Sequence, residues 1–484
     1  MSATITSFSV YLVFLMSIGV YFYRKTANLE DYLIGGRAMG SWVTALSAQA
    51  SDMSGWLLMG LPGAVFLGGL SQAWIAVGLF IGTVLNWKYI AARLRVYTEE
   101  TDSMTLPSFF EDRFGDPTGL LRIISAAIIL LFFTIYSASG LVASGKLFES
   151  LFNIEYTAAV IIGGLAIVLY TFLGGFMAVS WTDFFQGILM FFAITIVPTI
   201  AYGEIGGLDS IIAISAENNI SLSMLPEGIT ITAVISALGW GLGYFGQPHI
   251  LARFMGIDTI KKVAPARKIA VIWVAISLTA AVLVGIIAVP MFPEIADSEK
   301  VFIEMIAQIF NPWLGGILLA AILSAIMSTI DSQLLVSSST LTEDFYNKII
   351  KREASETEKM WAGRFFVIVI AVIAFILALN PENTVLDLVA YAWAGLGAAF
   401  GPAVIFALFS KKTSWRSILI GMIAGTITLV FWKESGLGAE LYEIIPGFFV
   451  NIAFVILFDR IYSQSNQKVL DKFEEVEKIY QRDI

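Results

Sequence analysis

Long apolar segments follow one another along the whole chain, each about as long as a membrane-spanning helix. The hydrocarbon core of a bilayer is about 30 Å thick, so a helix crosses it with roughly 20 apolar residues. By this measure we predict about thirteen spans, near residues 5–23, 42–69, 72–92, 121–147, 157–179, 184–203, 230–252, 269–290, 303–341, 364–380, 384–409, 415–432 and 441–460. The stretch 303–341 leaves room for a short interfacial helix before its span. The pattern predicts an all-α integral membrane protein.

The composition agrees with this pattern and excludes several classes of protein. Of the 484 residues, 57% are hydrophobic and 14% are charged, whereas soluble proteins are about 45–50% apolar and about 25% charged. The chain has 0 cysteines and 1 histidine, His249, which excludes disulfides, Cys/His metal sites and thiol catalysis. The net charge is -9 and the basic residues form no patch. We therefore expect neither an enzyme nor a nucleic-acid partner.

Basic residues indicate how the spans are oriented, because cytoplasmic loops are enriched in lysine and arginine. Arg24 and Lys25 follow the first span and no basic residue precedes it, which is the reverse of a secretory signal peptide. Three of the 29 basic residues lie at predicted outer ends, namely Lys146, Lys300 and Lys433. The others, including Arg253, fall on the predicted inner side. We predict a multi-pass protein of the plasma (inner) membrane, embedded in lipid, with its N-terminus outside and its C-terminus cytoplasmic.

Two of the predicted spans contain residues that interrupt a helix. Residues 47–63 combine Asp52 and several hydroxyls with glycines and Pro62, and residues 239–248 combine glycines with Pro248. A broken helix exposes backbone polar groups, which lipid tolerates only around a cavity or a bound ion. The two breaks are five spans apart, so a second five-span unit would be inverted, as in transporters with a site at the membrane midplane. Alternatively, the glycines only allow close helix packing.

Two acidic residues at membrane depth are candidates for function. An ionisable side chain there costs at least about 2.5 kcal/mol, so Asp52 is a functional candidate, although it could instead cap the broken half-helix. Asp183 stands at the start of the predicted sixth span. An aspartate suits the N-terminal cap of a helix, and we weigh this interpretation equally with a role at an ion site.

A stripe of small and hydroxyl residues runs along the predicted ninth span. Ala325, Ser328, Thr329 and Ser332 follow the spacing of one helical face. Such hydroxyls could simply hydrogen-bond neighbouring helices. They could also join free carbonyls of a broken span to bind a hard cation such as sodium, which prefers oxygen ligands.

Four aromatic residues lie in spans beside small or polar neighbours: Trp56, Tyr136, Trp240 and Tyr244. Gln247 and Pro248 continue the face on which Trp240 and Tyr244 lie. Aromatic rings could enclose a small apolar ring, although most tryptophans and tyrosines of a membrane protein belong to its core or its interfacial belts.

The broken second span carries a family resemblance. Residues 50–63, read as ASDMSGWLLMGLPG, resemble the signature of the sodium/solute symporter family. Three further stretches are similar to motifs of the same family, namely residues 170–186, 239–249 and 327–335. The resemblance covers nearly the whole chain, and in the second span and around Trp240 it is closest to the proline-transporting branch.

The resemblance implies a leucine-transporter-type fold with an inverted 5+5 repeat. It divides the chain into an N-terminal extra transmembrane helix and inner loop at 1–41, five-helix repeats at 42–229 and 230–410, two C-terminal transmembrane helices at 411–462 and a cytoplasmic tail at 463–484. We predict that the tail is a solvated helix or a frayed end and assign it no function.

The resemblance also implies site residues. A sodium site would use the carbonyls of Ala50, Met53 and Ala325 with the hydroxyls of Ser328 and Thr329, and Asp52 would act in sodium-dependent function. The substrate candidates are Ser54, Gly55, Trp56, Tyr136, Trp240, Tyr244, Gln247, Pro248 and Ser332. Some members of the family bind a second sodium near the equivalents of Asp183 and Ser332. Here Asp331 replaces a hydroxyl of that site, which argues against a second sodium.

We therefore expect a sodium-coupled symporter that carries L-proline into the cell by alternating access and functions as a monomer. Na+ and L-proline would be its transported partners. Another solute, such as pantothenate, a sugar or another amino acid, is the alternative within the family. A membrane sensor or channel that does not transport is the alternative from another class.

Overall fold

The computed structural model describes residues 2–23, 29–173, 175–350, 354–380 and 383–483, and most of them are helical. Among these residues, 9 helices are long and apolar enough to cross a membrane, and Tyr156–Ile167, Ile231–Gly246 and Ile444–Asp459 are shorter apolar helices. One of the long ones, Trp56–Glu100, runs through two predicted spans. Every predicted span thus coincides with helical structure. Arg24, Lys25 and Gly174, which the sequence analysis used, lie outside the described residues.

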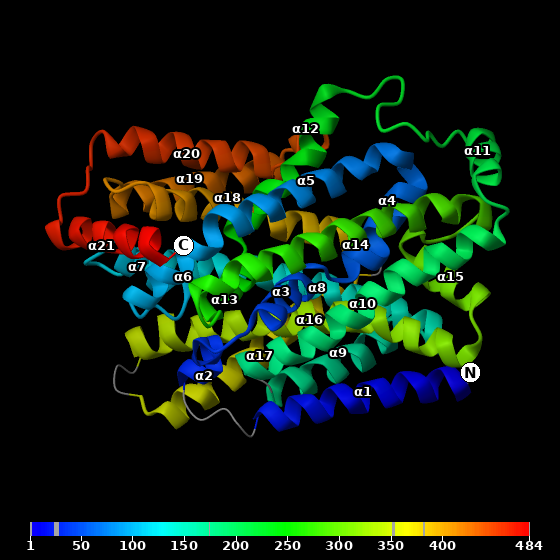
Figure 1. Ribbon diagram of the computed structural model, residues 1–484, viewed down its shortest axis with the longest axis horizontal. Coiled ribbons are helices and arrows are strands. Elements are labelled where there is room, and N and C mark those ends of the chain that lie inside the picture. Colours follow the sequence, from blue (N-terminus) through cyan, green and yellow to red (C-terminus); the bar gives the residue numbers. More distant parts are fainter. Residues whose placement is uncertain (1, 24–28, 174, 351–353, 381–382, 484) are drawn as a thin grey trace.

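The helices run side by side along the long axis of the molecule (Figure 1). We call one end the N-terminal face: it holds the start of α1 (Ser2–Tyr23), together with α11 (Leu208–Glu217) and α15 (Val301–Ile309). The other end is the C-terminal face, with α2 (Leu29–Ile34), α7 (Leu106–Phe114) and the tail helix α21 (Gln467–Asp483). The short α15 comes before the long α16 (Pro312–Thr340), which confirms the helix predicted ahead of the ninth span.

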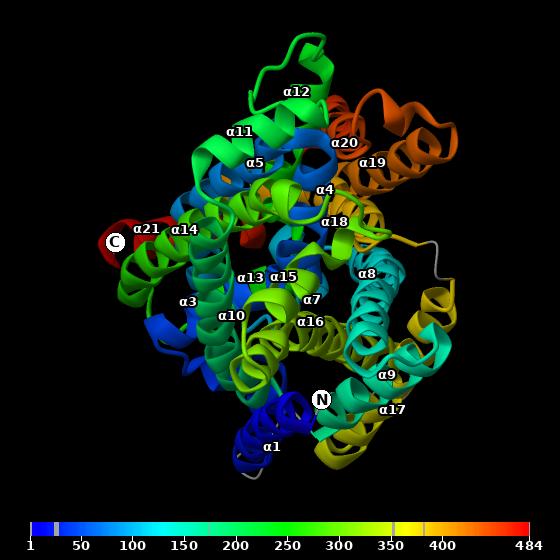
Figure 2. The same cartoon turned by 90° about the vertical axis from the view of Figure 1, so that its right-hand side faces the viewer.

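The first and the last spans flank a central bundle. Figure 2 looks along the helices and shows α1 on one side of the bundle and α19 (Trp415–Glu434) and α20 (Ile444–Asp459) on the other. α1 packs against α10 (Phe176–Glu204) and α16, whereas α19 and α20 pack against each other and against α18 (Val385–Phe409). The site described below lies between these flanking helices.

Both predicted helix breaks are present. In the second span, α3 (Ser41–Asp52) ends where Met53 leaves the helical region, with φ −80° and ψ 72°. A π-helical turn, Trp56–Gly60, and then α4 (Leu61–Gly68) complete the span. In the seventh span, α12 (Ile231–Gly239) passes into a 3-10 segment, Trp240–Gly246, and Pro248 begins α13 (Pro248–Gly256). Proline suits that first helical position because it needs no hydrogen-bond acceptor there.

The sixth span starts earlier than predicted. α9 (Tyr156–Leu173) ends before the extended residue Gly175, and α10 begins at Phe176 rather than near residue 184. Gly175 is therefore the residue that precedes the helix. Asp183 consequently lies inside α10 and is not its cap.

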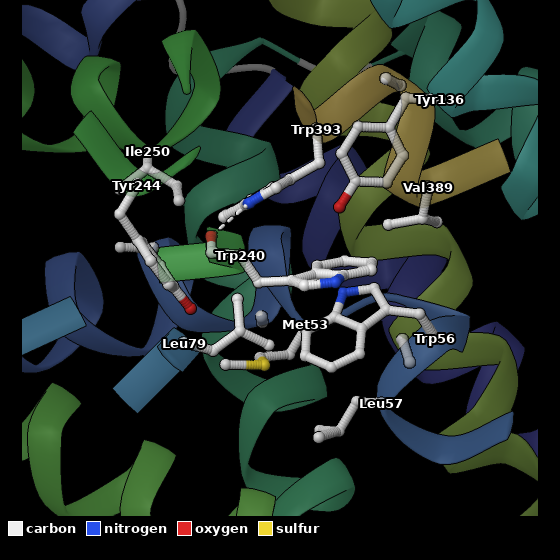
Figure 3. Packing of buried hydrophobic residues seen from close by; sticks show 14 of the residues in the cluster. Met53, Trp56, Leu57, Leu79, Tyr136, Trp240, Tyr244, Ile250, Val389 and Trp393 are labelled. Atoms are coloured by element: carbon white, nitrogen blue, oxygen red, sulfur yellow. Dashed lines mark hydrogen bonds between the residues drawn. The ribbon is translucent and has the colours of Figure 1, made fainter. Parts of the chain in front are cut away.

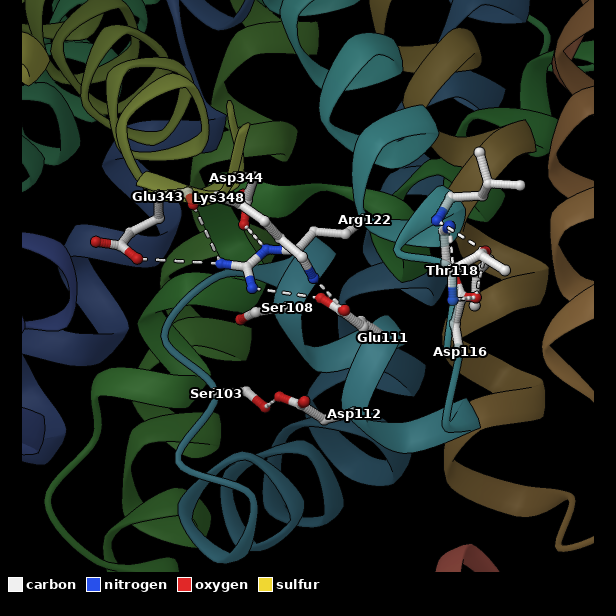
Figure 4. A network of polar contacts seen from close by, with 12 residues as sticks. Ser103, Ser108, Glu111, Asp112, Asp116, Thr118, Arg122, Glu343, Asp344 and Lys348 are labelled. Atoms are coloured by element: carbon white, nitrogen blue, oxygen red, sulfur yellow. Dashed lines mark hydrogen bonds and ion pairs between the residues drawn. The ribbon is translucent and has the colours of Figure 1, made fainter. Parts of the chain in front are cut away.

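Ion pairs tie the C-terminal face together (Figure 4). Arg122, on α8 (Leu120–Phe152), pairs with Asp344 on the π-helical segment Leu341–Ile350 and, at 3.3 Å, with Glu111 on α7. Lys348 also pairs with Glu111. The tail helix α21 packs on the same face, where Lys472 pairs with Glu100 at 2.9 Å. The tail is therefore a docked helix and not a frayed end.

Candidate functional site

The end of α3 meets the middle of α16 at a cluster of oxygen atoms. Ser54 N–H donates to the carbonyl of Asp52 at 2.9 Å, so it does not continue the helix by bonding to the carbonyl of Ala50. Ser328 Oγ occupies that place at 2.7 Å, and Thr329 Oγ1 lies 3.5 Å from the same carbonyl. Both hydroxyls are 3.2 Å from the carbonyl of Ala325. The helix break thus frees a carbonyl that faces the hydroxyl stripe of α16.

Four of the five predicted sodium ligands therefore lie together. The fifth, Met53, directly follows the last residue of α3 and donates its N–H to the carbonyl of Gln49 at 2.8 Å. Carbonyl and hydroxyl oxygens are the donors that a hard cation prefers. All of these residues are buried.

Asp52 closes the same end of α3 but does not act as a cap. Its Oδ2 accepts a hydrogen bond from the Tyr244 hydroxyl at 2.5 Å, whereas Oδ1 is buried and has no partner among the described residues. Its carbonyl accepts from Trp56 Nε1 at 3.0 Å and from the Tyr136 hydroxyl at 3.5 Å. Asp52 therefore links the two broken spans and α8, and the capping alternative is not realised.

The predicted aromatic residues meet beside this carboxylate. Figure 3 shows the indoles of Trp56 and Trp240 lying against each other with the Tyr136 hydroxyl pointing toward them. The two indole centroids are 6.4 Å apart. Trp393, on α18, packs edge-on against Tyr244 at 5.0 Å and donates its Nε1 hydrogen to the carbonyl of Trp240 at 2.8 Å. Trp393 thereby stabilises the 3-10 segment Trp240–Gly246 through both contacts.

Three other candidates shape the breaks and lie outside this aromatic cluster. Gln247 donates through Nε2 to the carbonyls of Gly243 and Trp393, at 3.2 and 3.1 Å. A Cβ atom on Gly55 would lie 2.9 Å from the Cβ of Ala143, so the glycine allows α8 to approach closely. Pro248 starts α13. Ser54 remains beside the cluster, since its Oγ accepts from the Trp56 N–H at 3.4 Å.

A cavity of about 630 Å³ opens at the N-terminal face and is lined in part by Trp240 and Tyr442. The two rings stack with centroids 5.4 Å apart. The Tyr442 hydroxyl donates to the carbonyl of Ala390 at 2.7 Å. Trp240 therefore lies between this cavity and Trp56, the neighbouring ring of the aromatic cluster.

Asp183 and Ser332 belong to a different cluster. Asp183 Oδ2 accepts from Ser47 Oγ at 2.7 Å and from Arg253 Nη2 at 3.0 Å. The same Arg253 nitrogen lies 2.5 Å from Ser332 Oγ. Ser332 is thus bonded to an ion pair and is not among the aromatic residues. Arg253 is fully buried and lies on the helix α13, not in a loop.

Sequence reasoning missed Arg253, Trp393 and Tyr442. The predicted seventh span ended at residue 252, one position before Arg253. Arg253 follows His249 by four residues on α13, and this helical spacing could have shown that it belongs to the same buried helix. Trp393 and Tyr442 come from α18 and from the loop before α20. No local motif connects these residues to a break that lies about 150 or more residues earlier in the chain.

A sequence model of the Sodium:solute symporter family matches residues 32–425, and the chain belongs to this family. It is 48% identical to the sodium/proline symporter of Escherichia coli over 98% of this chain and 96% of that one. It is 45% identical to the high-affinity proline transporter PutP of Bacillus subtilis, over 95% and 98%. The osmoregulated proline transporter OpuE of the same organism is also 45% identical, over 99% of both chains.

Two solved structures share the fold. A Na+-coupled sialic acid symporter in a substrate-bound, outward-open state has a TM-score of 0.82 at 18% identity, over 96% of this chain and 99% of that one. The nucleobase-cation-symport-1 family transporter MHP1, closed around bromovinylhydantoin, has a TM-score of 0.57 at 14% identity, over 92% and 98%. These likenesses confirm the leucine-transporter-type fold. The family model and the full-length relatives confirm a transporter rather than an enzyme.

Proposed function

We propose that this protein transports L-proline into the cell together with sodium. Three relatives whose names describe proline transport are 45% to 48% identical to it over nearly its full length. The observation in the structure that carries the proposal is the oxygen cluster at the break of α3, two residues away from Asp52 and beside buried aromatic rings.

Sodium would replace the hydrogen bonds within the oxygen cluster. The carbonyls of Ala50, Met53 and Ala325 and the hydroxyls of Ser328 and Thr329 would surround it, because a hard cation prefers several oxygen ligands. The ion would join α3 to α16. Asp52, whose carboxylate among the described residues is partnered only by a phenol at Oδ2, would add attraction for the cation without being one of the five ligands.

The substrate would bind between the aromatic residues and the start of the second half-helix. Ser54 and Gly55 precede the turn Trp56–Gly60, and the positive end of a helix favours a carboxylate. Trp56, Tyr136, Trp240 and Tyr244 would cover the pyrrolidine ring, since aromatic rings offer a large contact area at a low cost in entropy.

Coupling would follow from alternating access. Proline shifts the protein toward its occluded state only through a higher affinity for that state, and sodium must raise proline affinity by the factor by which proline raises sodium affinity. We place the protein in the plasma membrane, with the N-terminal face outside and the C-terminal face in the cytoplasm. The repeats would be 42–229 and 230–410, and the functional unit a monomer in lipid.

The driving force is sufficient. One charge crossing 100 mV contributes about 2.3 kcal/mol, and a tenfold sodium gradient contributes about 1.4 kcal/mol. Their total, roughly 3.7 kcal/mol, sustains on the order of 500-fold accumulation with one sodium per solute.

The test is uptake of labelled proline by the purified protein in proteoliposomes, with an inward sodium gradient or with potassium in place of sodium. We expect uptake only with sodium, and competition by unlabelled proline but not by pantothenate, sugars or other amino acids. Uptake that ignores sodium refutes the coupling. If another solute competes more strongly than unlabelled proline, that solute is the substrate. Binding of proline without uptake indicates a sensor.

A further inference from the structure

Arg253 is a fully buried cation at the centre of four helices. It lies on α13, and its guanidinium bonds to Ser47 of α3 at 3.0 Å, Asp183 of α10 at 3.0 Å and Ser332 of α16 at 2.5 Å. It also donates to the carbonyl of His249 at 3.0 Å. The Phe176 ring covers it with its centroid 5.2 Å away.

The atoms around this guanidinium form the kind of cage that a metal cation would use. One carboxylate oxygen of Asp183 and the hydroxyl of Ser332 face Arg253 Nη2, and the hydroxyl of Ser47 faces Nε of the same guanidinium. Asp331 lies next to Ser332 with its Oδ1 3.4 Å from that hydroxyl. Arginine keeps its charge in proteins and presents five donors in a planar fork. The side chain therefore occupies the cage permanently. It would exclude a mobile cation both by electrostatic repulsion and by its volume.

The cage is adjacent to the proposed sodium site. Ser47 lies three residues before Ala50 on α3, and Ser332 lies four residues after Ser328 on α16, which is one helical turn in each case. Ser332 Oγ also lies 2.7 Å from the carbonyl of Ser328. Arg253 thus joins the same two helices that carry the sodium ligands, one turn away from them.

We infer that the Arg253 guanidinium is a tethered cation that takes the place of a second sodium. It fixes transport at one sodium per solute and positions α3 and α16 for the mobile ion. Arg253 is a positioning residue, because it contacts neither the oxygen atoms of the proposed sodium site nor the aromatic cluster. The inference rests on the proposed sodium-coupled symport.

The number of sodium ions per solute tests the inference in the unmodified protein. Proteoliposomes with 100 mV and a tenfold sodium gradient should accumulate proline to on the order of 500-fold with one sodium and to on the order of 10⁵-fold with two. Paired fluxes of labelled sodium and proline should give a ratio of about one. A ratio of two, falling to one in Asp331→Asn, overturns the inference and makes the Asp183–Asp331 region a second sodium site. Absence of any sodium-dependent uptake refutes instead the proposed function.

A charge variant tests the tethering. Arg253→Gln leaves Asp183 without its cation, so we expect a second sodium to become necessary and the Hill coefficient for sodium to rise from about one toward two. The additional change Asp183→Asn should return it to about one. Arg113→Gln is the matched control: Arg113 is also fully buried, but it bonds to the carbonyls of Ala407 and Ser410. An unchanged Hill coefficient and flux ratio in folded Arg253→Gln overturns the inference.

Discussion

Replacing Ser328 by alanine should weaken the binding of sodium much more than it weakens the fold. The Ser328 hydroxyl lies 2.7 Å from the carbonyl of Ala50 and 3.2 Å from that of Ala325. It therefore stands between the two helices that the ion would join. Alanine removes this oxygen and keeps the helix propensity of the position high.

The magnitude follows from the contact that is lost. A hydrogen bond or polar contact to a charged group contributes about 1.5–3 kcal/mol, against about 0.5–1.5 kcal/mol for a neutral pair. The sodium concentration for half-maximal uptake should therefore rise roughly ten- to hundredfold. By reciprocity, the half-saturating proline concentration should rise at low sodium and return toward the unmodified value when sodium is saturating.

The assay is initial uptake of labelled proline by proteoliposomes over a matrix of sodium and proline concentrations. Ser324→Ala is the matched control, because Ser324 lies one turn earlier on α16 and is equally buried. Its hydroxyl lies 2.7 Å from both the carbonyl of Ala320 and the Tyr11 hydroxyl, away from the break of α3. Equal sodium dependence in Ser328→Ala and Ser324→Ala, or a proline effect that persists at saturating sodium, would refute the assignment.

Three further changes test other parts of the structure. Trp240→Ala removes the ring that lies between the cavity at the N-terminal face and the other aromatic residues, so the half-saturating proline concentration should rise at least about tenfold in uptake assays while sodium dependence changes little. Arg122→Gln removes the arginine that pairs with the buried carboxylate of Asp344 at the C-terminal face. Removing one partner of such a pair costs about 3–5 kcal/mol of stability. A cysteine placed at Ser337, in a chain with 0 native cysteines, should then react faster with maleimide. Gly243→Ala forces a Cβ atom onto the indole packed there, whereas Gly203→Ala meets nothing within 4 Å, so only the former should lower the melting temperature in detergent.

The spans and their breaks could be predicted because each depends on local chemistry. The length of an apolar helix is set by the bilayer, and Asp52 within such a helix is costly wherever it points. The start of α10 could not be placed in this way. No charge marks the boundary, and the segment from Phe176 to Asp183 continues the apolar pattern of the preceding span. The extended residue Gly175, directly before Phe176, marks the boundary in the structure.

Spacing alone predicts only the part of the site whose residues share a segment. Ala325, Ser328 and Thr329 lie on one face by helical geometry, whereas Ala50 was implied by the family resemblance, and the structure places its carbonyl beside Ser328 and Thr329. The support from Trp393 and the stack of Tyr442 on Trp240 depend on tertiary packing. Spacing along the chain carries no information about such contacts.

Charge at membrane depth has two different meanings in this protein, and the partners of each carboxylate distinguish them. Asp183 is paired with Arg253, a cation that cannot leave. Asp52 is bonded at Oδ2 to the uncharged Tyr244, and its Oδ1 has no partner among the described residues. A buried carboxylate without a fixed countercharge favours a cation from solution. In the proposed mechanism a mobile ion would therefore gain most from binding at the break of α3, and the Asp183 cluster, held by its own arginine, would be the fixed frame against which that ion joins α3 to α16.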